Sequence, residues 1–243
     1  MNERTKLKAS DGHELDAYVA RPSSAPVAGL VVIQEAFGVN SHIRSVADGY
    51  ARDGFLAIAP ALFDRIERGV ELGYEGPDRE KGMALAQQMN DDTVKDIDAA
   101  LAWLREQNAG KSGVIGYCLG GTMAWLAATR LNIGAAVGYY GGHIARFAQE
   151  TPRSPVMLHF GKLDKHIPKE DIDRIDARPD KDSRVSKESR TTTELPGPVG
   201  PRPAGTADVP GSTTSSTVSV GSKPDFENVY RRTPVAAEPA PKK

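Results

Sequence analysis

The stretch SGVIGYCLGGTMAWLAATRL, residues 112–131, carries the strongest fold signal in the chain. Its first part reads as a buried strand that ends at Cys118, and its second part is apolar enough for a buried helix. Gly116 and Gly120 stand two residues before and two residues after the cysteine. A strand that turns this tightly into a helix leaves no room for side chains at those two positions, so the pattern predicts a nucleophile elbow centred on Cys118.

Apolar runs and amphipathic segments alternate on both sides of this stretch. Further strands are expected at residues 14–20, 27–33 and 55–60, and within residues 133–140 and 154–160. Helices are expected at residues 43–52, 94–107, 122–131 and 168–175. Strands that alternate with helices predict an α/β fold in three layers, with helices on both faces of a mostly parallel sheet.

Length and charge limit the function classes. A chain of 243 residues suits one large domain, and its 31 basic and 32 acidic residues are interspersed, which predicts no nucleic-acid partner. The N-terminus lacks the apolar run of a signal peptide, and no apolar stretch reaches membrane-spanning length, so we expect a cytoplasmic protein without a membrane partner. The single cysteine excludes an internal disulfide. No cofactor and no metal site are expected.

The composition changes near residue 178. From Pro179 to Lys243 the chain has one leucine, no isoleucine, tryptophan or methionine, and dense proline, serine, threonine and glycine. Such a segment cannot bury enough apolar area to offset the entropy of ordering its backbone. We therefore expect an α/β domain over residues 1–178 and a disordered tail over residues 179–243.

Three motifs in order resemble those of the dienelactone hydrolase family, a group of cysteine enzymes within the α/β-hydrolase superfamily. They are QEAFGVN at 34–40, the elbow GYCLGG at 116–121 and HFGKLDKHIP at 159–168. The resemblance covers about residues 5–175. It implies a hydrolase of carboxylic esters or lactones, acting on a small molecule, in an α/β-hydrolase fold. The sequence does not identify the substrate or the oligomeric state.

The resemblance also implies roles for individual residues. Cys118 would be the nucleophile, Glu35 would help to activate its thiol, and Asp164 would orient a catalytic histidine. The backbone N–H of Leu119, at the start of a helix, points toward a developing oxyanion, and the resemblance favours Ala36 for the second N–H. The same helix N-terminus is expected to favour the thiolate form of Cys118.

Arg65 resembles the residue that binds a substrate carboxylate in the family, because a guanidinium fork suits a carboxylate. Each of these side chains also has a simpler interpretation. Cys118 would be a small core residue, Glu35 would pair with Arg44, Asp164 would serve only its turn, and Arg65 would belong to a solvated charged loop.

The pattern of the family breaks at the histidine, which belongs in a loop some tens of residues after Asp164. The chain has no histidine beyond His166. The five that it contains are His13, His42, His143, His159 and His166. A structural role is the preferred interpretation of each, with His143 and His166 as alternative bases. The segment that should hold the last strand, the histidine loop and a closing helix is replaced by the tail, so we expect an α/β-hydrolase fold that lacks its last strand and helix. One hypothesis is that the end of the gene is read out of frame or was exchanged, and the competing function is a catalytically degenerate small-molecule-binding or thiol-reactive domain.

Overall fold

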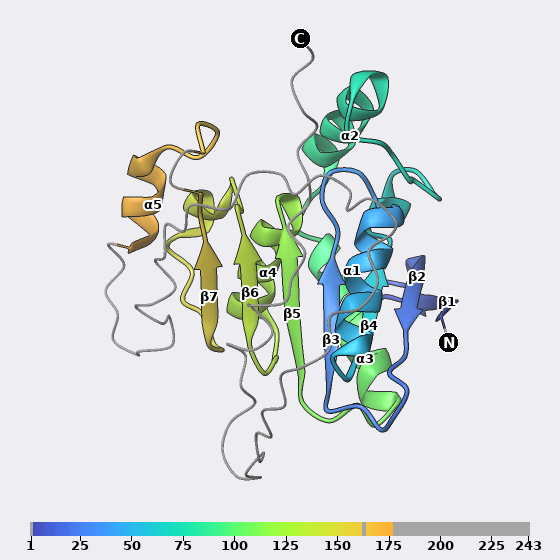
Figure 1. Cartoon of the computed structure of the whole chain (residues 1–243). Helices are drawn as coiled ribbons and strands as arrows, with labels where there is room; N and C mark the ends of the chain where they lie inside the picture. Colours follow the sequence, from blue (N-terminus) through green and yellow to red (C-terminus); the bar gives the residue numbers. More distant parts are fainter. Residues whose placement is uncertain (1, 162–163, 177–243) are drawn as a thin grey trace, which may run out of the picture. The chain divides into compact units, whose positions relative to one another are not determined.

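A computed structural model describes residues 2–161 and 164–176, and the predicted tail at 179–243 lies outside these residues. Seven strands form one sheet in the order β1-β2-β4-β3-β5-β6-β7 (Figure 1). The strands are β1 (Asn2–Lys8), β2 (Glu14–Ala20), β3 (Ala28–Ile33), β4 (Phe55–Pro60), β5 (Ser112–Tyr117), β6 (Ala136–Tyr139) and β7 (Val156–His159). β1 pairs antiparallel with β2 and β2 with β4, whereas β4, β3, β5, β6 and β7 are parallel neighbours. The predicted mostly parallel sheet is confirmed.

Helices cover both faces of this sheet, which confirms the three-layer α/β-hydrolase architecture. The helical elements are α1 (Ser41–Arg52), η1 (Leu62–Arg65), α2 (Gly76–Gln88), α3 (Thr93–Glu106), α4 (Leu119–Arg130), η2 (Ile144–Phe147) and α5 (Lys169–Asp176). In Figure 1, α1 crosses in front of the sheet and α4 lies behind β5 and β6, while α3 contacts α4. Because both faces are covered, every residue of β3 and β4 is buried, as continuous apolar runs predict.

The helix after the elbow is buried along almost its whole length. Residues 119–129 of α4 are all buried, and Trp125 is completely inaccessible. The Trp125 indole N–H donates a hydrogen bond to the carbonyl of Phe147, so its polar atom has a partner inside the core. This packing fixes the axis of the helix whose first turn lies beside Cys118.

The sequence patterns did not predict β1 and α2. β1 is an edge strand rich in charged residues, and it is held by its pairing with β2 through the turn at residues 9–13. α2 buries only Gly82 and Leu85, so it lacks the apolar stripe that marks an amphipathic helix. Hairpin pairing therefore decides β1, whereas α2 has no apolar stripe that a sequence pattern could show.

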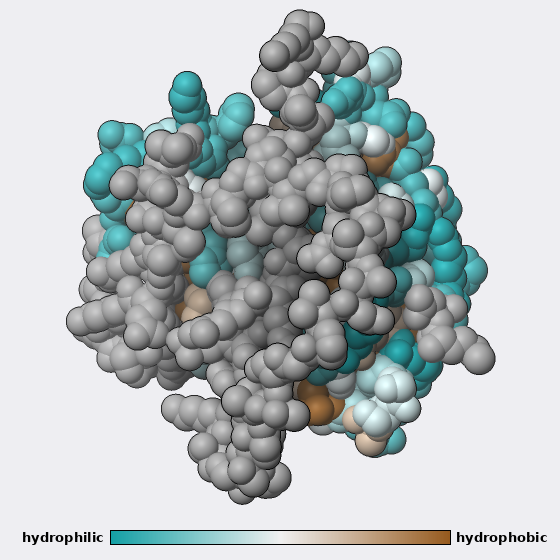
Figure 2. Space-filling model, in the orientation of Figure 1, coloured by the Kyte–Doolittle hydropathy of each residue, from teal (hydrophilic) through white to brown (hydrophobic). Residues whose placement is uncertain are grey.

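The described surface is mainly polar. Figure 2 shows mostly hydrophilic side chains outside the grey atoms. Among the described residues, the large hydrophobic side chains that are exposed are Val27, Ile66 and Met83. None of the described helices is long and apolar enough to cross a membrane.

Candidate active site

The turn between β5 and α4 has the geometry of a nucleophile elbow. Cys118 has φ 55° and ψ −115°, a left-handed conformation that a residue with a side chain rarely adopts. A Cβ added at Gly116 would lie 1.9 Å from the carbonyl oxygen of Gly120, and a Cβ at Gly120 would lie 2.5 Å from that of Ile33. Both glycines are thus required by close backbone approaches, as their spacing around the cysteine indicates.

The sulfur of Cys118 lies against two backbone donors. The N–H groups of Leu119 and Ala36 both donate hydrogen bonds to it, which lowers the pKa of the thiol. Burial acts in the opposite direction and is the larger effect, and the charge of Glu35 adds to it, so the pKa of the Cys118 thiol is raised overall. The N–H of Leu119 at the helix N-terminus favours the thiolate, as expected, but burial and the neighbouring carboxylate oppose it and have the larger effect on the pKa.

Glu35 follows β3 at the carboxyl end of the sheet and is only 6% exposed. Its Oε2 accepts a hydrogen bond of 2.7 Å from the hydroxyl of Tyr74, and its Oε1 accepts one of 3.0 Å from the hydroxyl of Tyr140. The alternative pairing with Arg44 does not occur, because that guanidinium donates to Glu71 and to the carbonyl of Val39. The carboxylate of Glu35 is directed toward the site, not toward a surface cation.

Tyr74 reaches Glu35 because two loops are joined by backbone hydrogen bonds. The N–H of Leu72 donates to the carbonyl of Phe37 over 2.9 Å, and residues 38 and 71 form an isolated β-bridge. The rings of Phe37 and Tyr74 then pack with centroids 4.6 Å apart. Gly82 of α2 abuts the same loop, since a Cβ there would lie 2.2 Å from the carbonyl oxygen of Ala36.

Tyr140 reaches the other oxygen of Glu35 from a position directly after β6. Its φ of 40° is left-handed, and its N–H donates to the carbonyl of His159 over 2.7 Å. The tight turn at the end of β6 therefore directs the phenol toward the elbow. Sequence reasoning missed both tyrosines. A tyrosine that directly follows a strand at the carboxyl edge of the sheet, as Tyr140 does, was the available signal.

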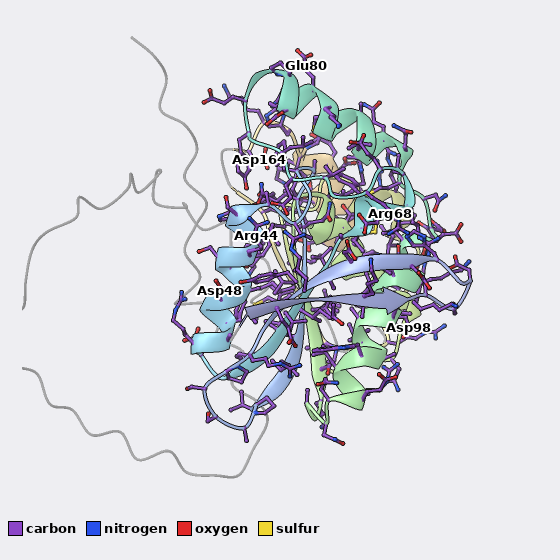
Figure 3. The ribbon with its side chains drawn as sticks, turned by 90° about the vertical axis from the view of Figure 1, so that its right-hand side faces the viewer. Arg44, Asp48, Arg68, Glu80, Asp98 and Asp164 are labelled. Carbon is purple, nitrogen blue, oxygen red and sulfur yellow. The ribbon has the colours of Figure 1, made fainter. Side chains whose placement is uncertain are left out.

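Asp164 follows β7. In Figure 3 it lies toward the same end of the domain as Arg44, which is near the start of α1, and Glu80, which is in α2. Its Oδ1 accepts a hydrogen bond of 2.8 Å from the backbone N–H of His166, so it does serve its turn. Its negative charge also contributes to the raised pKa of Cys118, which indicates that the carboxylate is near the sulfur. The site thus brings together Cys118, Glu35, Asp164 and the N–H groups of Leu119 and Ala36.

Arg65 has a different environment from the predicted one. Its guanidinium donates to both oxygens of Asp96, over 2.6 and 2.8 Å, and also to Asp11 over 3.0 Å. Asp96 is completely buried in α3, so this fork neutralises a carboxylate of the protein itself. A substrate carboxylate would have to displace one of these partners, and the geometry gives the predicted substrate-binding role of Arg65 no support.

The imidazoles of four histidines have the following surroundings. His143 donates its backbone N–H to Thr122 at the start of η2, and burial lowers the pKa of its imidazole. His159 stacks on Tyr139 with ring centroids 4.8 Å apart, and His42 lies edge-on to Tyr74. His166 is exposed. Within residues 2–161 and 164–176, Asp164 accepts no hydrogen bond from an imidazole, and no group of His, Cys, Asp or Glu side chains is arranged to hold a metal ion.

Comparisons with known proteins identify the family of this chain. The sequence profile of the dienelactone hydrolase family matches residues 15–184. A carboxymethylenebutenolidase of Pseudomonas putida is 33% identical over 174 residues, which cover 69% of this chain and 74% of that protein. A putative carboxymethylenebutenolidase of Synechocystis sp. is 33% identical over 180 residues, 67% of this chain and 72% of its own.

Solved structures show the same fold. The crystal structure of a putative dienelactone hydrolase from Klebsiella pneumoniae superposes with a TM-score of 0.59 and 28% identity, over 72% of this chain and 79% of that one. An α/β serine hydrolase homologue from Coxiella burnetii, at 14% identity, shares the fold with a TM-score of 0.54 over 71% of this chain and 80% of its own.

Proposed function

The chain belongs to the dienelactone hydrolase family and is a hydrolase, and from this premise we propose that Cys118 is its nucleophile and attacks the carbonyl carbon of a carboxylic ester or lactone. One observation carries the proposal. The sulfur lies on a left-handed turn at the N-terminus of α4, with one backbone N–H directed at it from the first residue of α4 and another from the loop after β3. A carbonyl oxygen that enters beside the sulfur meets the same two donors.

The first half of the reaction uses groups that are all present. The thiol of Cys118 loses its proton to the carboxylate of Glu35, and the sulfur forms a bond to the carbonyl carbon. The N–H groups of Leu119 and Ala36 hold the oxyanion while the ester C–O bond breaks, and the proton leaves with the alkoxide as an alcohol. The product is a thioester on Cys118.

The second half, hydrolysis of the thioester, needs a base that activates water. The family resemblance assigns this step to a histidine oriented by Asp164, and the chain has no histidine beyond His166. General acid–base help of this kind is worth roughly 10²–10⁴ in rate. We therefore expect the thioester of Cys118 to form faster than it is hydrolysed.

The test is the time course of p-nitrophenol release from p-nitrophenyl acetate. We expect a burst of one equivalent per chain followed by a slow phase, and no burst in Cys118→Ala. His166→Gln is the matched control for a substitute base, and its slow phase should equal that of the unaltered protein. Absence of a burst, or a burst that survives Cys118→Ala, refutes the proposal and favours the degenerate binding domain.

A further inference from the structure

Asn40, the last residue of the motif QEAFGVN, carries a buried amide whose two ends bind different segments. It is 5% exposed and is the N-cap of α1, where its Oδ1 accepts a hydrogen bond of 3.2 Å from the N–H of Ile43. Its Nδ2 donates a hydrogen bond of 3.0 Å to the carbonyl of Leu72. Helix capping needs only the side-chain oxygen, so it does not explain the contact that the nitrogen makes.

This second contact joins the loop after β3 to the loop before α2. Leu72 is bound through both of its backbone groups, because its N–H donates to the carbonyl of Phe37 over 2.9 Å and its carbonyl accepts from Asn40. Between these two hydrogen bonds, Gly38 and Glu71 form an isolated antiparallel bridge. The side chain of Asn40 therefore closes a short ladder between the two loops.

Ala36 lies directly before this ladder in the chain. Its N–H is one of the two backbone donors directed at the sulfur of Cys118. Its carbonyl has no room to rotate toward α2, because a Cβ at Gly82 would lie 2.2 Å from that oxygen. The direction of the Ala36 N–H depends on the backbone on either side of it. β3 holds the chain before Ala36, and the ladder that Asn40 closes holds the chain after it.

We propose that Asn40 is a positioning residue: by donating a hydrogen bond to the carbonyl of Leu72, it holds the loop after β3 in place and directs the N–H of Ala36 toward the oxyanion that forms during acylation. The inference rests on the proposed function, because it concerns one of the two N–H groups of that reaction. The competing interpretation is that Asn40 only caps α1.

Two reactions of the same sulfur separate these interpretations. In acylation by p-nitrophenyl acetate, the sulfur of Cys118 bonds to the carbonyl carbon, negative charge develops on the carbonyl oxygen, and p-nitrophenolate leaves. In alkylation by iodoacetamide, the sulfur bonds to a methylene carbon and iodide leaves, so no oxyanion forms. Both reactions use the thiolate, and a change in the pKa of Cys118 therefore alters both rates in the same direction. The ratio of the two rates reports on the oxyanion donors.

The variant that tests the proposal is Asn40→Ser. Serine caps a helix about as well as asparagine, but its shorter side chain carries no amide to reach the carbonyl of Leu72. Arg44 still joins the two loops by donating to Glu71 and to the carbonyl of Val39, so the variant should fold. Removal of an oxyanion donor costs roughly 10²–10³ in rate, and for a misdirected donor we expect the ratio of acylation to alkylation to fall at least about ten-fold.

Ser154→Ala is the matched control. The hydroxyl of Ser154 is also in a buried residue and also donates to a backbone carbonyl of a distant segment, that of Ile133, over 2.9 Å. Its loss should lower the free energy of unfolding in urea and leave the ratio of the two rates unchanged. An unchanged ratio in Asn40→Ser, or an equal fall in Ser154→Ala, overturns the proposal.

Hydrogen–deuterium exchange of the unaltered protein covers the case in which Asn40→Ser does not fold. The amide of Leu72 should exchange slowly, because the ladder closed by Asn40 protects its hydrogen bond to Phe37. Exchange of this amide at the rate of an open loop contradicts the proposal. Failure of the proposed function has a different signature, which is the absence of a p-nitrophenol burst from the unaltered protein.

Discussion

Gly116→Ala tests the elbow most severely, because the space for its side chain is filled by backbone. The added Cβ would lie 1.9 Å from the carbonyl oxygen of Gly120, 2.3 Å from its carbonyl carbon and 3.0 Å from its Cα. These atoms belong to the first turn of α4, which is buried along its length and cannot shift as a flexible side chain would. Overpacking commonly costs about 1–3 kcal/mol, and we expect about 3 kcal/mol or more here because the contact is with backbone.

The assay is urea unfolding followed by circular dichroism, combined with the iodoacetamide rate of Cys118. Gly49→Ala in α1 is the matched control, because the nearest atom to its added Cβ is the end of the Arg52 side chain at 3.6 Å. That substitution should stabilise the protein by about 0.5–1 kcal/mol through helix propensity. If Gly116→Ala is as stable as the unaltered protein and Cys118 reacts at the same rate, the strained elbow is refuted.

Two further substitutions test other parts of the structure. Arg65→Met should destabilise the protein by about 3–5 kcal/mol in urea unfolding, because it leaves the buried carboxylate of Asp96 uncompensated, and Arg65→Met with Asp96→Leu should recover most of the loss. An Arg65→Met variant as stable as the unaltered protein would refute this structural role. Burial lowers the pKa of His159 from 6.5 to about 4, so its stabilising effect is full above pH 6.5 and is lost as pH falls toward 4. Between pH 6.5 and pH 4, His159→Phe should therefore lose about 2 kcal/mol less free energy of unfolding than the unaltered protein. His166→Gln, a control at an exposed position, should lose as much as the unaltered protein. If His159→Phe and the unaltered protein are equally sensitive to acid, the buried imidazole of His159 does not cause the loss.

The parts of the site that the sequence predicts are those fixed by local geometry. The glycine before Cys118 is predictable because the clash that it avoids is with the carbonyl of Gly120, four residues away, whereas the clash avoided at Gly120 is with the end of the neighbouring strand β3. The placement of Glu35 and Asp164 follows from the rule that residues after parallel strands share one edge of the sheet. The overall direction of the pKa shift of Cys118 could not be predicted, because a helix N-terminus is visible in the sequence, whereas the burial and the carboxylate that outweigh it are not.

The parts that the sequence does not predict depend on contacts between distant segments. Tyr74 reaches the site through the pairing of residues 34–40 with residues 70–74, and no local pattern specifies that pairing. Arg65 pairs with Asp11 and Asp96, which lie 54 and 31 residues away along the chain. The charges near Arg65 in the sequence therefore could not show whether it binds a substrate or forms a structural ion pair. The division into a domain over residues 1–178 and a disordered tail stays a prediction.

The central claim is that Cys118 becomes acylated, and mass spectrometry of the protein quenched after brief exposure to p-nitrophenyl acetate tests it most directly. We predict one acetyl group per chain, located on the peptide that contains Cys118 and absent from Cys118→Ala. An unmodified protein, or an acetyl group that maps to another residue and persists in Cys118→Ala, would contradict the account.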